Sequence, residues 1–250
     1  MIVYDNTKSM RKNKKILADL ENKAILQTLF YRIKNWGEKR GCKYKGCWTF
    51  CPKVIYLIML QPLLKNLGKY VSLTEDDIAI IQGLFKVSRY RRHQFLLQEG
   101  AVTRFETFVL SGLTRTYEMD DKGQEHVVQF GPEDWWVGDL YSFLTETPAT
   151  FNIDCLEDTE VAQITKSDLE KLYQEVPKLE RHFRILVQNA FVATTQRLSS
   201  TLSRSAAERY EEFILKYPQI EQRVPNHQIA SYLGITPQSL SRIRSQTRVR

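Results

Sequence analysis

Residues 226–244 read NHQIASYLGITPQSLSRIR, and this stretch determines how the C-terminal part of the chain folds. Gly234 is suited to end one helix in the left-handed conformation, which costs other residues about 1 kcal/mol or more. Thr236 can then cap a second helix, with Pro237 at its first position, where the missing N–H is no loss. The small core between the two crossed helices comes from apolar residues at helical spacing, namely Ile229, Leu233, Ile235, Leu240 and Ile243. The sequence therefore predicts a helix-turn-helix.

The outward face of the second helix carries side-chain types that read base edges in the major groove of DNA. Gln pairs with adenine and Arg with guanine through two hydrogen bonds, each worth about 1 to 3 kcal/mol of discrimination. The later Arg residues and the N–H groups at the helix start are expected to hold phosphates instead. A helical hairpin that merely packs is the alternative, and the agreement of cap, glycine, core spacing and charge argues against it. The predicted DNA-binding residues are Thr236, Gln238, Ser239, Arg242, Arg244 and Arg248.

The positive charge of the chain is concentrated near its ends. The formal net charge is +7, yet residues 1–58 alone hold 13 Lys and Arg against 4 Asp and Glu. A second basic patch lies within residues 219–250, where five Arg face one acid, Glu221. Charge confined to a short terminal segment is typical of a nucleic-acid-binding element, so double-stranded DNA is the expected partner.

Residues 1–58 form a basic N-terminal extension in which no domain is predicted. A weakly amphipathic stretch is followed there by a piece rich in Gly, Cys and Lys that has neither a helical nor a strand period. A coherent pattern begins near Met59, and we hypothesise that Met59 is the natural start of the protein. N-terminal sequencing of protein from its native source tests this hypothesis, and a chain that begins at Met1 contradicts it.

Residues 87–164 predict a β-roll. Short β-prone pieces alternate with turn signals, and glycines recur every 7 to 12 residues, at positions 100, 112, 123, 131 and 138. We therefore assign residues 59–176 to one effector domain built mainly of strands. A capping box in Ser167-Asp168-Leu169-Glu170 indicates where the chain turns helical.

A long helix is predicted from Lys178 to about Leu202. Apolar residues recur every three or four positions along it and give it one apolar seam. The seam either packs on the roll or pairs with the same helix of a second copy. The pairing fits better, because a helix of about seven turns is longer than the roll can cover. We therefore assign residues 177–204 to a dimerisation helix and residues 205–250 to the DNA-binding domain, and we expect a homodimer.

A β-roll, a long helix and a C-terminal helix-turn-helix, in that order, resemble the Crp/Fnr family of bacterial regulators. The resemblance covers about residues 62–246. It implies an α+β fold with a cyclic-nucleotide-binding-like jelly roll, and a dimeric, sequence-specific transcription regulator whose effector domain adjusts two recognition helices. The motifs that carry it are Glu99-Gly100, Phe130-Gly131, Trp136-Val137-Gly138-Asp139-Leu140, Thr147-Pro148, Leu156-Glu-Asp-Thr-Glu160 with Ile164, and Ser231 to Arg244.

The nucleotide-binding motif of that family is degenerate here. In members that bind cyclic nucleotides, a Gly-Glu pair holds the ribose and an Arg just after a Pro holds the phosphate. The corresponding residues are Gly138-Asp139 and Pro148-Ala149-Thr150, and no Lys or Arg occurs from Trp135 to Gln163. Because a phosphate buried without a cationic partner carries a large desolvation cost, we expect no tight binding of cyclic AMP.

The same part of the roll remains the candidate pocket for a less charged small molecule. Its aromatic residues have an alternative interpretation as ordinary core. The candidate pocket residues are Trp136, Gly138, Asp139, Leu140, Tyr141, Pro148, Ala149 and Thr150.

The four cysteines raise an alternative function, a redox or iron–sulfur sensor. Family members of that kind use N-terminal cysteines and one in the β domain, and this chain has Cys42, Cys47, Cys51 and Cys155. The spacing of the first three and the position of Cys155 before Leu156 both depart from that pattern. We therefore expect no metal site and no cofactor.

The sequence predicts no enzyme, no membrane span and a cytoplasmic location. The four histidines are scattered, and neither a nucleophile elbow nor a phosphate loop occurs. The longest apolar run, Val54 to Leu60, is far shorter than the roughly 20 residues of a transmembrane helix, and the first residues lack the pattern of a secretory signal. A ligand-binding module without DNA binding is the remaining alternative, which the helix-turn-helix disfavours.

Overall fold

The computed structural model describes residues 51–247, with side chains for residues 55–246. From Lys53 onward these residues belong to one compact unit. The predictions for residues 1–50, including Cys42 and Cys47, and for Arg248 lie outside the described residues.

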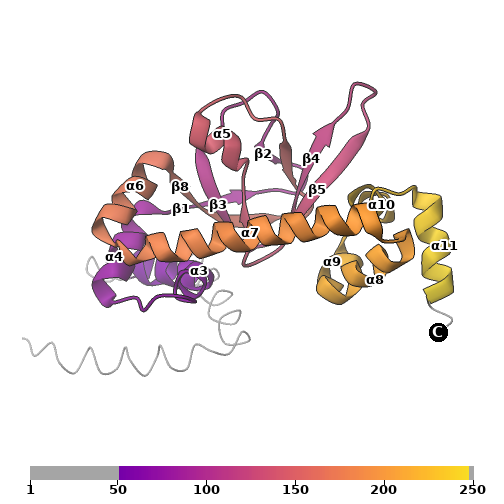
Figure 1. The fold of residues 1–250 in the computed structure, drawn as a ribbon. Coiled ribbons are helices and arrows are strands. Elements are labelled where there is room, and N and C mark those ends of the chain that lie inside the picture. The colour runs from indigo at the N-terminus through magenta and orange to yellow at the C-terminus, as the bar shows by residue number, and fades with distance from the viewer. Residues whose placement is uncertain (1–50, 248–250) are drawn as a thin grey trace, which may run out of the picture. The chain divides into compact units, whose positions relative to one another are not determined.

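Two four-stranded antiparallel sheets form a β-roll (Figure 1), which confirms the predicted fold class. The strand order is β1-β8-β3-β6 in one sheet and β2-β7-β4-β5 in the other. A short helix, α5 (Leu140–Thr145), connects the two sheets between β6 and β7. The strands are β1 (Lys86–Tyr90), β2 (Phe95–Leu97), β3 (Phe105–Ser111), β4 (Thr114–Met119), β5 (Glu125–Gly131), β6 (Trp136–Val137), β7 (Asn152–Cys155) and β8 (Thr159–Thr165).

The first sheet is covered on one side by three helices, α3 (Cys51–Leu67), α4 (Glu75–Leu84) and α6 (Lys166–Glu175). Their apolar residues form one buried cluster with side chains of β3 and β8, including Phe108, Leu110, Ala162 and Ile164. Burial of this continuous apolar surface is the main stabilising contribution to the arrangement.

Helix α3 extends across the boundary that the sequence analysis places at Met59. The helix begins at Cys51, and Tyr56 and Leu57 already pack against the cluster. The hydroxyl of Tyr56 also donates a hydrogen bond to the main-chain carbonyl of Phe85, just after α4. A chain that starts at Met59 would therefore lose the first two turns of this helix.

The predicted capping box at Ser167 was wrong by two residues. Helix α6 begins at Lys166, and Thr165 at the end of β8 is its N-cap, accepting a hydrogen bond from the N–H of Asp168. Thr165 is still extended, with φ −75° and ψ 161°, so the strand leads directly into the cap.

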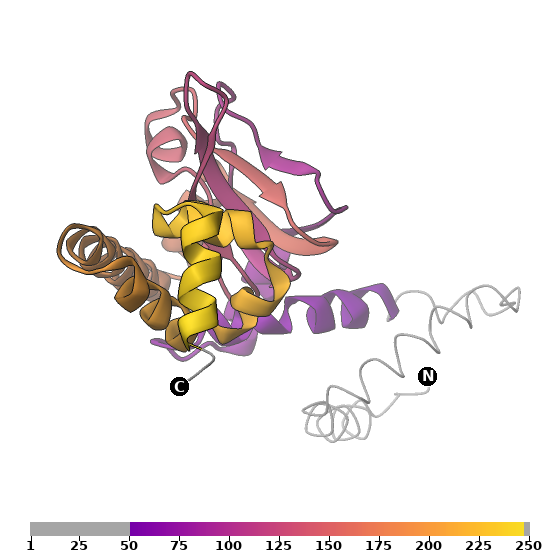
Figure 2. The same cartoon turned by 90° about the vertical axis from the view of Figure 1, so that its right-hand side faces the viewer.

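Helix α7 (Lys178–Ser203) has 26 residues and confirms the predicted long helix. It runs beside the roll in Figure 1 and is seen nearly end-on in Figure 2. Its first turns are anchored by buried Leu179 and His182. Its later turns expose large apolar side chains, namely Val187, Phe191, Val192, Leu198 and Leu202.

Four further helices follow α7: α8 (Ala206–Lys216), α9 (Pro218–Arg223), α10 (Asn226–Leu233) and α11 (Pro237–Thr247). They share a second buried cluster with the roll, in which Tyr117, Val127 and Phe130 meet residues of α8 and α10. No helix within residues 51–247 is long and apolar enough to cross a membrane.

We expect Gly112→Ala to destabilise the protein by about 2 kcal/mol or more. Gly112 joins β3 to β4 with φ +99°, and a Cβ there would lie 2.8 Å from the carbonyl oxygen of Asp158. Gly83→Ala is the matched control, because a Cβ on this helical glycine meets nothing within 4 Å in the described residues. The control should stabilise by about 0.5 to 1 kcal/mol. Urea denaturation measures both changes, and equal stability of the two variants contradicts the prediction.

We also expect Glu106→Gln to change how stability depends on pH. Burial raises the pKa of Glu106, on β3, from 4.5 to about 7. A raised pKa means that the folded state favours the neutral acid. The contribution of Glu106 to the free energy of unfolding is therefore fully present below pH 4.5 and is lost as the pH rises toward 7. Glutamine stays neutral, so the variant should match the parent near pH 4.5 and exceed it at pH 8 by about 1 to 3 kcal/mol. A stability difference that is the same at both pH values contradicts this.

Candidate DNA-binding surface and effector cavity

The turn of the helix-turn-helix has the geometry that its sequence predicts. Gly234 follows α10 in the left-handed conformation, with φ 66° and ψ 36°. The N–H of Ile235 then donates to the carbonyl of Ala230 at 3.0 Å, which closes the end of the helix. The five predicted core residues are buried or half-buried in one cluster. The local prediction is thus confirmed.

The second helix, α11, begins at a side-chain cap. The Thr236 hydroxyl accepts a hydrogen bond from the N–H of Ser239 at 3.2 Å, and the two hydroxyl groups lie 2.9 Å apart. Leu240 is fully buried, whereas Gln238 and Arg242 are exposed. Gln238 and Arg242 therefore project from the side of α11 that does not pack.

Arg244 differs from the other predicted DNA-binding residues because its guanidinium group is held within the domain. It lies 2.6 Å from Glu221 and donates to the Tyr210 hydroxyl at 3.0 Å and to the side-chain carbonyl of Asn226. The side chain is 16% exposed. These contacts join α11 to α8, α9 and α10, so Arg244 fixes the position of α11.

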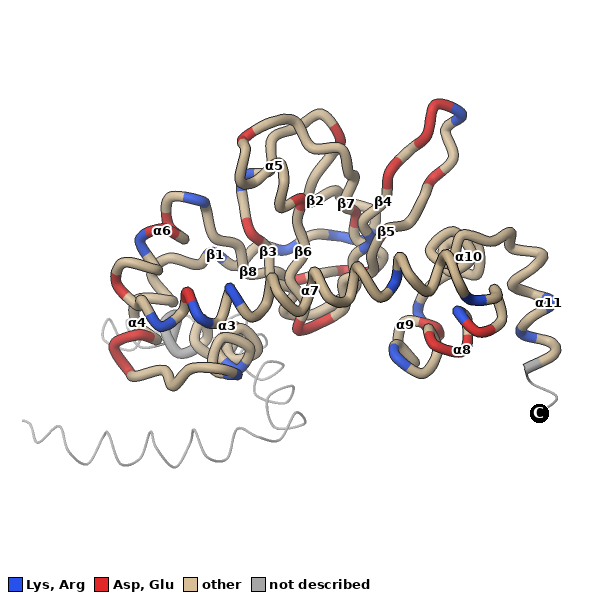
Figure 3. The backbone as a smooth tube through the Cα atoms, in the orientation of Figure 1, with Lys and Arg blue, Asp and Glu red and all other residues tan. Residues whose placement is uncertain are grey.

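Arg223, from the same basic patch, connects the DNA-binding domain to the roll. Its guanidinium binds Glu157 at 2.7 Å and Glu133 at 2.9 Å, and these hydrogen bonds raise its pKa. Burial opposes ionisation of Glu133, but the hydrogen bonds from Arg223 leave the pKa of this carboxyl below its usual value. The structure describes three Arg of the C-terminal patch. Arg223 and Arg244 form ion pairs, and Arg242 forms none within residues 51–247. Figure 3 marks the basic positions along α11 in blue.

Two residues that the sequence analysis missed hold α10 against β5. The Ser231 hydroxyl accepts a hydrogen bond from the N–H of Val127 at 2.9 Å and donates to the carbonyl of Glu125 at 2.7 Å. Arg197 of α7 donates to the carbonyls of Val128 and Tyr232, and its guanidinium stacks 4.0 Å from the centre of the Tyr232 ring. Arg197 gives no sequence signal, because an isolated Arg in a long helix is usually a solvated residue.

The candidate pocket residues do not come together around one cavity. The Trp136 ring packs against Phe85, Phe108 and Phe183, and its N–H donates to Asn66 at 3.2 Å. This is the ordinary core that the sequence analysis gave as the alternative. Leu140 and Tyr141 point outward on α5 and are 44% and 69% exposed.

Asp139 serves the local structure of the stretch that corresponds to the nucleotide-binding motif. Its carboxylate is buried and caps α5 by accepting from the N–H of Ser142 at 3.0 Å. The second oxygen accepts from the N–H of Thr150 at 3.2 Å, and Pro148 pairs with Val102. This carboxylate therefore holds α5 and the segment at Thr150 in place.

A cavity of about 470 Å³ lies between the two sheets of the roll. Of the eight candidate pocket residues, Gly138 lines it. The other lining residues come from β2, β3, β6, β7, β8 and the segment that joins β2 to β3. This segment includes Arg104, which lies outside the interval in which the sequence analysis sought a cation.

A family model described as the cyclic nucleotide-binding domain matches residues 87–176, which are the roll and α6. The transcriptional activator protein Anr of Pseudomonas aeruginosa is 25% identical over 185 residues, covering 69% of this chain and 75% of that protein. Anr of Pseudomonas protegens is 25% identical over 186 residues, with the same coverage.

Two solved structures share the fold. The c-di-GMP-responsive global regulator CLP of Xanthomonas campestris has a TM-score of 0.59 at 15% identity, covering 70% of this chain and 92% of that one. FixK2 of Bradyrhizobium japonicum has a TM-score of 0.57 at 19% identity, covering 66% and 85%. The family model matches the part of the chain that the sequence motifs assign to the roll. The chain is thus similar over residues 87–176 to the cyclic nucleotide-binding domain, and over 69% of its length to the Anr transcriptional activators.

Proposed function

We propose that this regulator binds double-stranded DNA sequence-specifically, as a homodimer, through α11. The observation that carries the proposal is the exposed pair Gln238 and Arg242 on a helix whose opposite side is fixed by buried Leu240. A helix held in this way can enter the major groove without rearranging, which keeps the ordering cost of binding low. Because its partner is chromosomal DNA, we propose a cytoplasmic location.

The predicted contact residues have distinct proposed roles. Gln238 and Arg242 read base edges, and the exposed start of α11, with Thr236 and Ser239, meets a phosphate. Arg244 acts by positioning α11, since its guanidinium is already bound to Glu221 and Tyr210. Arg248 remains a proposed phosphate contact.

The proposed dimer forms through α7. Its exposed apolar side chains, including Phe191 at 72% and Leu202 at 80%, leave a large apolar face uncovered in one copy of the chain. A parallel pair of α7 helices would bury this face and place one α11 in each half of a two-fold operator.

We further propose that the roll does not respond to cyclic AMP. Asp139 stands where family members place the Glu that holds the ribose, and Ala149, just after Pro148, stands where they place the Arg that holds the phosphate. The redox alternative loses support at Cys155, which is fully buried. Burial raises the pKa of this thiol to about 11, whereas a cluster ligand must be a thiolate.

Arg242→Ala should weaken DNA binding by about 1 to 3 kcal/mol per half-site, because it removes a bidentate contact to one base. The measurement is a gel-shift titration on a DNA site selected from a random pool with the parent protein. Selection repeated with the variant should lose its preference at one base pair per half-site. Arg89→Ala on β1 is the control, since this side chain is exposed and paired with Glu160. If Arg242→Ala binds as tightly as the parent, the assignment of α11 as the recognition helix is refuted.

Cyclic AMP at 1 mM should leave the melting temperature unchanged, because Ala149 stands where family members that bind it have the Arg that holds the phosphate. A ligand present at 100 times its Kd would stabilise the folded state by about 2.7 kcal/mol, which is a shift of several degrees. Differential scanning fluorimetry with and without the nucleotide checks this. A concentration-dependent rise of several degrees would show that the roll binds cyclic AMP after all.

A further inference from the structure

A cleft lies between the last turns of α7 and helix α8. Its volume is about 710 Å³, within the range of roughly 300 to 1,000 Å³ typical of ligand pockets. Residues of α7, α8 and α10 line this α7–α8 cleft, with Arg204 and Tyr217 at the ends of the first two helices. None of the described residues that line it belongs to the roll or to α11. The cleft is therefore separate from the cavity of the roll and from the proposed recognition helix.

The walls of the cleft carry more positive than negative charge. Four basic residues line it against one acid, Glu212. Glu212 pairs with Arg204 and also accepts a hydrogen bond from the Ser200 hydroxyl at 2.9 Å. An excess of positive charge in a concave surface favours an anion. Three of the four basic residues form no ion pair within residues 51–247, namely Arg197, Arg209 and Lys216.

Arg209 carries a donor that the described part of the chain leaves unsatisfied. One terminal nitrogen of its guanidinium donates to the carbonyl of Thr201 at 2.9 Å. The Nε atom is buried and has no hydrogen-bond partner among residues 51–247. Burial of an unpaired donor on a charged group is costly, and an anion close to the group lowers that cost. Arg209 is therefore a second, independent indication of an anion in the cleft.

Aromatic side chains form one wall of the cleft. The ring of Phe213 lies 5.8 Å from the ring of Tyr217 and 5.4 Å from that of Tyr232, measured between centres. The Lys216 ammonium lies 5.1 Å from the centre of the Tyr217 ring, so a cation stands beside this wall. Aromatic rings pack well against one another in stacked or edge-on arrangements. A flat aromatic body would bury its surface here with its negative groups near the cations.

The cleft stays open in the proposed dimer. Gln196 and Ser200 of α7 line it, whereas Leu198 and Leu202 belong to the exposed apolar face of the same helix. Residues two positions apart on a helix point in nearly opposite directions, because one turn takes 3.6 residues. The partner's α7 would therefore cover the side of the helix that faces away from the cleft.

We propose that the α7–α8 cleft binds a small aromatic polyanion, an organic molecule with a flat apolar body and two or more negative groups. The negative groups meet Arg209 and Lys216, and the flat body lies against the aromatic wall. Because the walls come from α7, α8 and α10, the bound molecule holds the long helix and the DNA-binding domain together. The inference goes beyond the proposed function, and binding is measured without DNA. Its outcome is therefore independent of whether α11 binds an operator.

Two naphthalene sulfonates with the same rings and different charge test the proposal. Isothermal titration calorimetry of the full chain uses naphthalene-1,3,6-trisulfonate and naphthalene-1-sulfonate as probes. The trisulfonate should saturate and should bind about tenfold or more tighter than the monosulfonate, because the attraction grows with the charge of the probe. Lys216→Gln should weaken the trisulfonate about fivefold, since it removes a cation that no acid in the described residues neutralises.

Glu212→Gln should act in the opposite direction and strengthen binding of the trisulfonate about fivefold. The variant removes the one acid of the cleft and releases Arg204 from its ion pair. A protein that merely fails to fold cannot gain affinity, so this variant separates a binding effect from a folding defect.

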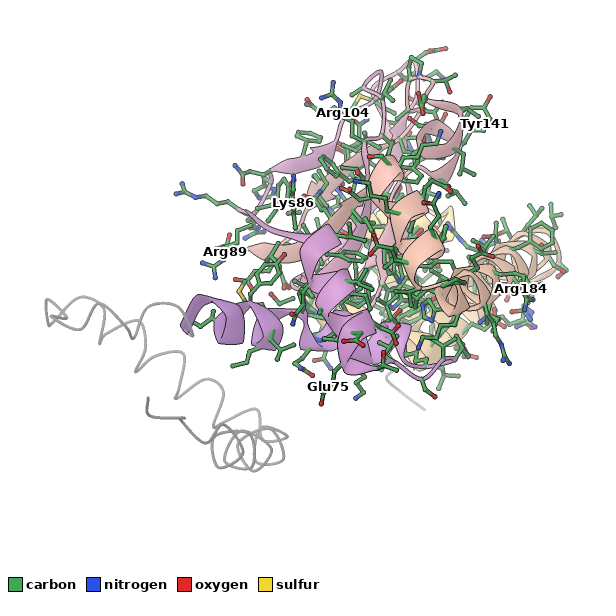
Figure 4. All side chains as sticks on the ribbon, turned by 90° about the vertical axis from the view of Figure 1, so that its left-hand side faces the viewer. Glu75, Lys86, Arg89, Arg104, Tyr141 and Arg184 are labelled. Atoms are coloured by element: carbon green, nitrogen blue, oxygen red, sulfur yellow. The ribbon has the colours of Figure 1, made fainter. Side chains whose placement is uncertain are left out.

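Arg89→Gln is the matched control and should leave the affinity for both probes unchanged. It removes an exposed Arg on β1 that does not line the cleft, and Figure 4 shows Arg89 well apart from α7. Absence of saturable binding overturns the proposal, as does equal affinity for the two probes. It is also overturned if Lys216→Gln behaves like the parent, if Glu212→Gln gains no affinity, or if Arg89→Gln loses as much affinity as Lys216→Gln.

Discussion

Arg197 is the contact on which the arrangement of roll, long helix and DNA-binding domain depends. From α7 its guanidinium reaches carbonyls of β5 and of α10, and it stacks on the Tyr232 ring. A guanidinium offers five N–H donors in one plane, so it can bind carbonyls from several elements at once, which a lysine cannot do in the same way. Its half-buried partners lose access to water, and loss of the Arg would leave them unpaired.

The apolar cluster around this contact includes residues of the roll, of α8, of α10 and of α11. Phe130 of β5 packs against Phe213 of α8 and Tyr232 of α10, with ring centres 6.4 and 5.3 Å apart. Strand β5 pairs with β4, and β4 pairs with β7, which contributes Ile153 to the cavity wall. Adjacent contacts thus connect the cavity with α10, and α10 with α11. A displacement of β5 relative to α7 would have to move α10 and α11 or break these contacts.

Sequence reasoning was accurate where structure depends on neighbours within one or two turns. Gly234, Thr236 and the apolar spacing of the helix-turn-helix act locally, and so does the length of α7. It did not detect the partners of Arg244, because Glu221 and Tyr210 lie 23 and 34 residues earlier in the chain.

The candidate pocket shows a second reason why prediction fell short. Successive residues of a strand face opposite sides, so in the two-residue strand β6 Val137 faces the cavity and Trp136 faces the helices. The motif supplied the correct strand, but composition alone did not settle which of the two residues faces inward. Arg104 was missed because its loop meets the cavity only after the two sheets close on each other.

The docking of α10 on the roll has a consequence for which substitutions the chain can accept. Ser231 and Arg197 bind main-chain atoms of Glu125, Val127, Val128 and Tyr232, and every residue type offers the same carbonyl. The interface therefore depends on the side chains of Ser231, Arg197 and Tyr232, whereas Glu125 and Val128 contribute main-chain carbonyls to it. Substitutions on the outer face of the β4–β5 hairpin can therefore accumulate while α10 keeps its position on the roll.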